Sequence, residues 1–299
     1  MEKKLVKEII SDYCVLDLET TGFSPHNDRI IEIGILKVND DIVVEKYSQL
    51  VNPHCAISST ITRKTGITND MVNDKPSLSD IKDDVLSFIG DRIIIGHNTS
   101  FDINFLEKQM SINIPIKYID TCCFSKRVYP ELENHKLDTL VAYLHLSNNE
   151  HRALADCISE KELYDAIKLE MTRKGLTIES LWPKKSSNSK RTHSSIVSPE
   201  DYKPDPDNFL YKKNVVITGT LKHLTREYAN QCIEAAGGFP KNDVNKKTDY
   251  VVVSDEAYCD PENKSKKQIK AEAFKEKGSD LEIIDESTFY DFLKNDLQK

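Results

Sequence analysis

Two carboxylates stand two residues apart in the segment Val15-Leu16-Asp17-Leu18-Glu19-Thr20-Thr21-Gly22. Apolar residues followed by small hydroxyl residues and a glycine predict a strand that runs into a tight turn. Because side chains alternate across a strand, Asp17 and Glu19 would share one face while the neighbouring leucines pack on the other. Two adjacent carboxylates repel unless a cation or a proton lies between them. Taken alone, the pair fits either a divalent-metal site or the solvated face of an edge strand.

Further side chains that could bind metal lie far along the chain. Asp102 follows the all-apolar run 93–95, which is typical of a buried parallel strand, at the start of a predicted helix. His151 and Asp156 are five residues apart, so a histidine before a helix and an aspartate one turn inside it can reach one cavity. Four carboxylates and a histidine are what two Mg²⁺ ions would need, since Mg²⁺ prefers oxygen ligands. Two ions roughly 3.5 to 4 Å apart hold the attacking and leaving oxygens of a phosphodiester, so the set predicts phosphoryl transfer.

The elements that would position these side chains form an α/β domain. Three β-rich runs separated by short polar turns predict an antiparallel meander, and shorter apolar runs add two more strands. Helical spacing of apolar residues predicts the flanking helices. We therefore expect a mixed five-stranded sheet with helices beside it. The predicted strands lie within 15–22, 30–38, 42–47, 93–95 and 118–119, and the predicted helices cover 77–89, 101 onward, 137–144 and 154–167.

A change of composition divides the chain into two domains. From about Trp182 to Asn208, Lys, Ser, Asn, Asp and Pro dominate and few apolar residues remain, which predicts a flexible linker, basic in its first half. The linker lysines fit simple solvation or a nucleic-acid contact. Beyond residue 209, strands alternate with helices and predict a small α/β domain with a parallel sheet. The expected boundaries are 8–175 for the first domain, 176–208 for the linker and 209–299 for the second domain.

The composition limits which cellular compartments and which kinds of partner fit the chain. The formal net charge of -8 over 299 residues argues against a broadly cationic nucleic-acid surface, although a local basic path remains compatible with it. The seven cysteines include no C-x-x-C pair and no zinc-site spacing. The amino terminus lacks the apolar run of a signal peptide, and no stretch is long enough to span a membrane. We expect a cytoplasmic protein with no membrane partner.

The acidic segments resemble the three ordered motifs of the DEDDh exonucleases, the group that contains the proofreading epsilon subunit of bacterial DNA polymerase III. The resemblance covers roughly residues 10 to 172, and the stretches 29–34, 65–72 and 136–140 agree with it too. It implies a ribonuclease-H-like fold and a 3′ to 5′ exonuclease that releases nucleoside 5′-monophosphates. The motifs are Asp17-Leu18-Glu19-Thr20-Thr21-Gly22, His97-Asn98-Thr99-Ser100-Phe101-Asp102 and His151-Arg152-Ala153-Leu154-Ala155-Asp156.

This resemblance also implies a role for each motif residue. Asp17 would bridge two Mg²⁺ or Mn²⁺ ions, and Asp102 would support the ion at the leaving group. Glu19 and Asp156 would complete the site that activates water. His151 would be the general base, and an ordinary histidine pKa of ~6.5 suits that role near neutral pH.

Substrate contacts would come from the same segments. Backbone N–H groups around Thr20 and Thr21 would hold the terminal nucleotide. Phe23 or Phe101 would stack on a base, although either ring also fits an ordinary place in the core.

The second domain resembles a BRCT domain over about residues 209 to 297, nearest the single type found in NAD-dependent DNA ligase and in the large subunit of replication factor C. Thr218, the Gly219 backbone, Arg226 and Lys267 match the phosphate pocket of members that bind a DNA 5′-phosphate or a phosphopeptide. Phe289 stands where many BRCT domains carry tryptophan, and the single copy casts doubt on tandem phosphopeptide binding. A domain that only docks a protein is the alternative. The matching segments are 216–221, 225–227, 235–238, 247–253 and 267–271.

Together the two resemblances predict a metal-dependent 3′ to 5′ exonuclease that acts on single-stranded or frayed 3′ ends of DNA in replication proofreading or repair, with the BRCT domain recruiting it. A 3′ to 5′ exoribonuclease is an alternative, because no residue visibly reads a 2′-hydroxyl. The non-enzymatic alternative is a DNA-end-binding or scaffold protein with a vestigial site. The presence of all five motif residues argues against this alternative.

Overall fold

The computed structural model describes residues 4–111, 116–132, 134–147, 151–182, 204, 208–222, 224–258 and 264–294. The chain divides into two compact units, Met1–Lys184 and Lys185–Lys299. Within the described ranges, no helix combines the length and the apolarity that crossing a membrane requires.

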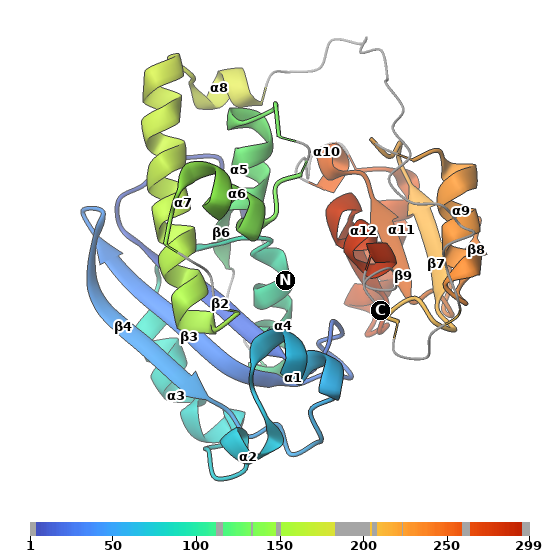
Figure 1. Cartoon of the computed structure of the whole chain (residues 1–299), viewed down its shortest axis with the longest axis horizontal. Coiled ribbons are helices and arrows are strands. Elements are labelled where there is room, and N and C mark those ends of the chain that lie inside the picture. The colour runs from blue at the N-terminus through green and yellow to red at the C-terminus, as the bar shows by residue number, and fades with distance from the viewer. Residues whose placement is uncertain are drawn as a thin grey trace. The chain divides into compact units, whose positions relative to one another are not determined.

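The first unit is built on a mixed sheet with the strand order β1-β6-β5-β2-β3-β4 (Figure 1). β3 runs antiparallel to both β2 and β4, whereas β2, β5, β6 and β1 pair in parallel. The predicted mixed five-stranded sheet is confirmed. A sixth strand, β1, extends the sheet beyond β6, and its two residues are too few to show a periodicity in the sequence. The strands are β1 (Lys4–Leu5), β2 (Tyr13–Thr20), β3 (Ile30–Asn39), β4 (Ile42–Leu50), β5 (Ile94–Gly96) and β6 (Lys117–Asp120).

Helices cover both faces of this sheet, and a hydrophobic core lies on each face. α5 and α7 pack on one face, and α3 and α4 pack on the other. The helices are α1 (Ser59–Thr65), α2 (Asn69–Val72), α3 (Leu78–Ile89), α4 (Ser100–Met110), α5 (Thr121–Val128), α6 (Leu137–Leu144), α7 (Ala153–Lys174) and α8 (Ile178–Leu181).

The side chains of β2 alternate between these two cores. Val15 belongs to the core beneath α7, whereas Leu16 and Leu18 belong to the core beneath α4. Asp17 and Glu19 continue the series of Val15. The two carboxylates therefore share the face that α7 covers, as the alternation predicts.

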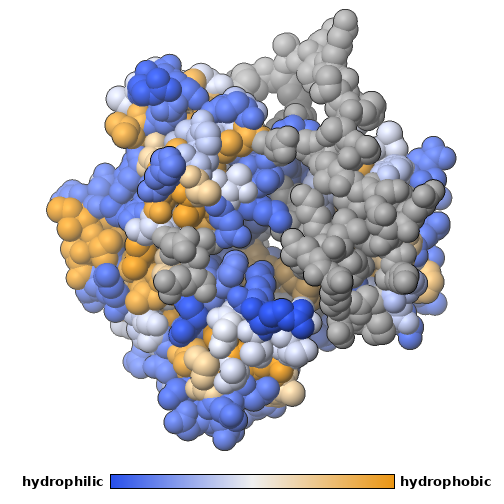
Figure 2. Space-filling model, in the orientation of Figure 1, coloured by the Kyte–Doolittle hydropathy of each residue, from blue (hydrophilic) through white to orange (hydrophobic). Residues whose placement is uncertain are grey.

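The exposed side chains of β4 show how the free edge of the sheet is kept soluble. Ile42 and Val44 are exposed, and Figure 2 shows hydrophobic surface on the side of the view where the β3–β4 hairpin lies. Glu45 and Lys46 follow directly and are exposed as well. Charged residues on an edge strand oppose pairing with another strand.

The first unit extends further than the sequence predicts. Residues 176–182 were expected in the flexible linker, but α8 begins at Ile178 and Leu181 is buried. The Trp182 ring lies 4.8 Å from the Phe124 ring, and the Arg127 guanidinium lies 4.6 Å from the Trp182 ring centre. These contacts hold the segment on α5, so the predicted linker starts too early. Most of its remainder, 183–203 and 205–207, lies outside the described residues.

The second unit contains a four-stranded, all-parallel sheet with the strand order β10-β9-β7-β8. The predicted parallel α/β domain is confirmed, while the short β8 and α10 were not expected. Phe289, the departure from the usual tryptophan, is fully buried. The elements are β7 (Asn214–Thr218), α9 (Arg226–Ala235), β8 (Phe239–Lys241), β9 (Tyr250–Val253), α10 (Asp255–Tyr258), α11 (Lys266–Glu276), β10 (Glu282–Asp285) and α12 (Glu286–Lys294).

Candidate metal centre

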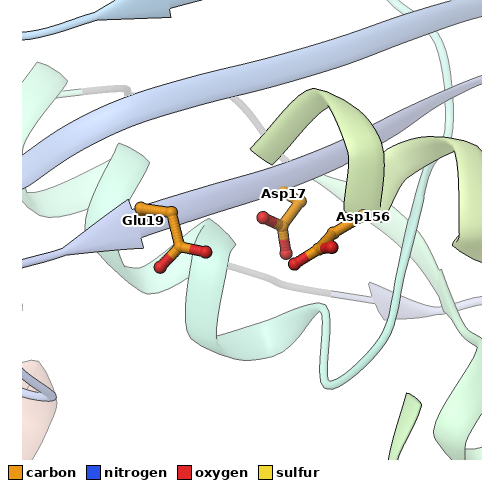
Figure 3. Close-up of side chains that lie close together, drawn as sticks. All are labelled: Asp17, Glu19 and Asp156. Atoms are coloured by element: carbon orange, nitrogen blue, oxygen red, sulfur yellow. The ribbon is translucent and has the colours of Figure 1, made fainter. Parts of the chain in front are cut away.

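Three of the predicted metal ligands meet on the face of β2 beneath α7. Asp17 and Glu19 come from β2, and Asp156 comes from the first turn of α7. Each offers a ligand atom, and these atoms all lie within 4.8 Å of one another. Figure 3 shows the three carboxylates on the same side of β2, with those of Asp17 and Asp156 turned toward each other. Asp156 follows Asp17 by almost 140 residues. At ~3.3 Å per residue, an extended chain of that length would hold the two side chains far apart. The packing of α7 on the sheet therefore brings them together.

Asp102 lies beside this group without belonging to it. It sits in the first turn of α4 and is buried. Its Oδ1 accepts a hydrogen bond from the backbone N–H of Leu18 at 3.2 Å, and Leu18 is the residue between Asp17 and Glu19. The fourth predicted ligand is thus fixed against the same strand.

The electrostatics of the group fit divalent cations. Burial is the main cause that raises the pKa of Asp17 well above its ordinary value, and the charges of Glu160 and Asp102 raise it further. Burial likewise raises the pKa of Glu19 to about 8 and that of Asp102 well above its usual range. Asp17 Oδ2 is buried and has no hydrogen-bond partner in the part of the chain that the structure describes. Repelling carboxylates with one unpartnered oxygen match the oxygen-rich ligand sets that Mg²⁺ and Mn²⁺ prefer.

The start of α7 is held on the sheet by Glu32 of β3, which stands opposite Glu19 in the β2–β3 register. Glu32 Oε2 accepts a hydrogen bond from the backbone N–H of Ala153 at 3.0 Å, and Oε1 lies 2.6 Å from Arg152 Nη2. Close approach also requires Gly34, because a Cβ there would overlap the Ala153 backbone. Glu32 is absent from the predicted site, although an acidic residue within the apolar run 30–38 is a signal that the sequence contains.

His151 lies directly before this helix start. It is half-buried and has a positive φ of 50°. Burial first, and then the charge of Lys64, lower the pKa of its imidazole. A lowered pKa keeps the ring neutral near neutral pH, which a general base requires.

Groups of Thr20 and Thr21 at the end of β2, where nucleotide contacts are predicted, already form hydrogen bonds within the protein. The backbone N–H of Thr21 donates to the carbonyl of Arg29 at 2.8 Å, and the Thr21 hydroxyl oxygen accepts from the Arg29 N–H at 2.9 Å. The Thr20 hydroxyl donates to the Gly22 carbonyl at 2.6 Å. The Thr21 N–H is thus bonded within the protein in this structure. The nucleotide contacts around Thr20 and Thr21 both stay predictions.

The two predicted stacking rings touch each other. The Phe23 and Phe101 ring centres lie 5.9 Å apart in an edge-to-face arrangement, and Phe101 also lies 4.9 Å from Phe105. Both Phe23 and Phe101 are half-buried. Each ring packs on one side and keeps exposed surface on another, so base stacking stays a prediction for both.

The four predicted phosphate-pocket residues of the second unit lie together at the end of β7. Arg226 Nη2 donates to the Gly219 carbonyl at 3.0 Å. The charge of Arg226, after burial, lowers the pKa of Lys267. The hydroxyls of Thr218 and Ser265 share a hydrogen bond of 2.6 Å. Ser265, which caps α11, therefore lies beside the residues predicted to form the phosphate pocket.

Comparison with known proteins gives two family matches. The family model described as Exonuclease (RNase_T) matches residues 14–164, and the model of the BRCA1 C Terminus (BRCT) domain matches residues 205–293. Two relatives are DNA polymerase III PolC-type proteins. That of Clostridium perfringens is 36% identical over 156 residues, covering 51% of this chain and 11% of the relative. That of Bacillus subtilis is 38% identical over 150 residues, covering 48% of this chain and 10% of the relative. The chain thus spans only about a tenth of the length of these relatives.

Two solved structures are similar to part of this chain. Exonuclease X in complex with 5′ overhanging duplex DNA is 28% identical, with 56% of this chain and 96% of that chain covered and a TM-score of 0.46. Exonuclease I of E. coli in complex with a dT13 oligonucleotide is 19% identical, with 56% of this chain and 43% of that chain covered and a TM-score of 0.48.

Proposed function

The chain belongs to the exonuclease family and carries a BRCT domain, and we propose that it is a metal-dependent 3′ to 5′ exonuclease that hydrolyses DNA from 3′ ends to nucleoside 5′-monophosphates. The observation that carries this proposal is the convergence of Asp17, Glu19 and Asp156 on one point, with a buried Asp17 oxygen that lacks a partner among the described residues. Such a group is costly to keep without cations.

In this proposal the acidic residues would hold two Mg²⁺ or Mn²⁺ ions. Asp17 would be the shared ligand, Glu19 and Asp156 would complete one site, and Asp102 would support the other. The bound ions would supply charge stabilisation to the attacking and leaving oxygens.

His151 is the group that moves a proton. Its neutral imidazole accepts a proton from the attacking water, whose oxygen forms the new bond to phosphorus. The bond between that phosphorus and the 3′ oxygen of the preceding nucleotide breaks. The terminal nucleotide leaves with its 5′-phosphate, and the departing 3′ oxygen takes a proton from water, which leaves the shortened strand with a 3′-hydroxyl.

The second unit would deliver the enzyme to its substrate in replication or repair. Thr218, Gly219, Arg226 and Lys267 would bind a DNA 5′-phosphate, and docking of a partner protein is the other use of the domain. We assign residues 8–182 to the exonuclease domain and 209–299 to the BRCT domain. We place this action in the cytoplasm.

The proposal is tested with a single-stranded DNA labelled at its 5′ end and an RNA of the same sequence, each with Mg²⁺ or Mn²⁺. We expect stepwise shortening of the DNA from its 3′ end with release of 5′-monophosphates, and no shortening with Asp17→Asn or in EDTA. Turnover of RNA alone would instead establish an exoribonuclease. If the wild-type chain shortened neither polymer, the site would be vestigial and the enzyme proposal would be wrong.

A further inference from the structure

Glu160 is a buried acidic residue of the first unit to which neither the sequence motifs nor the proposed reaction gives a role. It lies on α7 four residues after Asp156, so the two side chains share one face of the helix. Glu160 is only 1% exposed. A carboxyl group buried to this extent is costly unless its oxygens have partners, so its surroundings call for an explanation.

One oxygen of Glu160 connects α7 to the segment that leads to Asp102. Oε1 accepts a hydrogen bond from the backbone N–H of His97 at 2.9 Å. The His97 ring is itself held, with its nitrogens 2.9 Å from Thr121 Oγ1 and 2.7 Å from the His135 carbonyl oxygen. The turn at His97 is therefore a fixed point from which the chain enters α4. Glu160 ties this turn to the helix that carries Asp156.

The other oxygen has no such partner. Oε2 of Glu160 is buried and without a hydrogen-bond partner in the described part of the chain, and Asp17 Oδ2 is in the same condition. Burial is the first cause that raises the pKa of both carboxyl groups well above its ordinary value, and neighbouring acids raise it further, Glu160 for Asp17 and Asp102 for Glu160. Two unpartnered oxygens in one acidic group point to cations rather than to an internal hydrogen bond.

We propose that Glu160 is a fifth acidic residue of the metal centre, in which one oxygen fixes the turn that leads to Asp102 and the other adds negative charge that increases the affinity for divalent cations. This inference rests on the proposed metal-dependent function. Glu160 is a positioning residue here, since it acts on the cations through its charge and on Asp102 through the His97 turn. Carboxylates that support the direct ligands are a common part of metal sites.

The test compares Glu160→Gln with Glu160→Ala in the full chain, without DNA. The glutamine keeps an oxygen that can accept the His97 N–H but removes the charge, whereas alanine removes both. Glu162→Gln is a matched control, because Glu162 lies on the same helix and accepts the backbone N–H of Ser147 at 2.6 Å, outside the acidic group. Mn²⁺ affinity is measured by calorimetric titration, and exchange of the His97 amide hydrogen is followed by NMR.

We expect Glu160→Gln to lower the Mn²⁺ affinity by about 10-fold, in the range known for groups that support metal ligands, while exchange at His97 stays slow. Glu160→Ala should lower the affinity further and speed that exchange, and Glu162→Gln should change neither. If Glu160→Gln bound Mn²⁺ as tightly as the wild type, Glu160 would have a structural role only. If Glu160→Ala does not fold, Glu160→Gln alone decides.

The same titration separates this inference from the function on which it rests. A wild-type chain that binds no Mn²⁺ and no Mg²⁺ would overturn the metal-dependent function itself. A wild-type chain that binds Mn²⁺, together with a Glu160→Gln variant of equal affinity, would overturn only the role of Glu160.

Discussion

Glu32 of β3 forms an ion pair with Arg152, the residue directly before α7, with 2.6 Å between Oε1 and Nη2. The Glu32 side chain is 2% exposed and that of Arg152 is 39% exposed, so the carboxylate is inside the protein while the guanidinium reaches water. Because the same carboxylate accepts the Ala153 N–H, it fixes the first turn of α7. His151 on one side of this contact and Asp156 on the other are positioned by it.

We expect Glu32→Ala to destabilise the protein by about 1–3 kcal/mol, because the buried Ala153 N–H loses its acceptor. We also expect a lower exonuclease rate, because the first turn of α7 no longer fixes the positions of His151 and Asp156. Urea denaturation and the DNA-shortening assay measure the two effects. Glu45→Ala is the control, since it removes an exposed ion pair with Lys37 and should cost less than ~1 kcal/mol. Equal effects of the two substitutions would show that Glu32 does not hold α7.

Gly34 provides a second test of the same contact. We expect Gly34→Ala to destabilise the protein by about 1–3 kcal/mol, the usual cost of overfilling a packed site, because the added Cβ would push the Ala153 backbone away from β3. Ser48→Ala, at the exposed position opposite Gly34 on β4, should be close to neutral. A neutral Gly34→Ala in urea denaturation would mean that α7 can shift without cost.

The local sequence pattern predicts which face of a strand a side chain occupies, but not which distant segments come into contact. The alternation in β2 correctly placed Asp17 and Glu19 on one face, because strand geometry fixes that relationship within a few residues. The convergence of Asp156 on the pair was predicted from the ligand types that two Mg²⁺ ions need and from the family resemblance, since spacing alone does not say how α7 crosses the sheet. Glu32 and Glu160 were missed because their partners, Ala153 and His97, are neighbours only in the folded chain.

The elements that escaped prediction are short or atypical. β1 has two residues, and β8 has three, one of which is Pro240. Neither can show an alternating pattern. Trp182 lies within the predicted linker 176–208, whereas its ring packs against Phe124. In each case a tertiary contact, absent from the local sequence, decides the structure.

The metal-free protein should lose stability as pH rises, because of Glu19. Burial first, and repulsion from Asp156, raise its pKa from 4.5 to about 8. An acid with a raised pKa in the folded state contributes stability that is present below pH 4.5 and is lost as pH rises through about 8. We expect wild type to become less stable than Glu19→Gln by at least about 1 kcal/mol at the upper end, since each pKa unit corresponds to ~1.4 kcal/mol.

Thermal denaturation of both proteins across this pH range, in EDTA and then in Mg²⁺, measures the effect. Mg²⁺ should restore wild type at the upper end of the range and should stabilise Glu19→Gln less. Parallel curves for the two proteins in EDTA would show that Glu19 does not titrate in this range.

The proposed role of His151 as general base leads to two linked predictions. His151→Ala should lower kcat by about 10²–10⁴-fold, the usual contribution of a general base, with unchanged Mn²⁺ affinity. Because Lys64 helps to lower the imidazole pKa, Lys64→Gln should move the acidic limb of the kcat profile toward higher pH at saturating Mn²⁺. His54→Ala, at an exposed histidine of the same unit, is the control. A near-wild-type rate for His151→Ala would remove it from the reaction.

The phosphate pocket of the BRCT domain is tested by binding rather than by turnover. Arg226 and Lys267 lie close enough for one charge to lower the pKa of the other, and a bound phosphate would relieve that repulsion. In an Asp17→Asn background, which prevents degradation, we expect DNA with a 5′-phosphate to bind ~10-fold more tightly than the same DNA without it, since hydrogen bonds to charged groups contribute about 1.5–3 kcal/mol. Fluorescence anisotropy measures both affinities.

Lys267→Glu should abolish that difference, because it replaces the cation beside Thr218 with a repelling carboxylate. Lys277→Glu makes the same change in charge at the other end of α11, where the side chain is exposed, and should leave the preference for the 5′-phosphate intact. If the chain with an unaltered pocket bound both DNAs equally, the hydroxyls of Thr218 and Ser265 would simply close the end of β7 through their mutual hydrogen bond. The BRCT domain would then recruit the exonuclease by docking a protein.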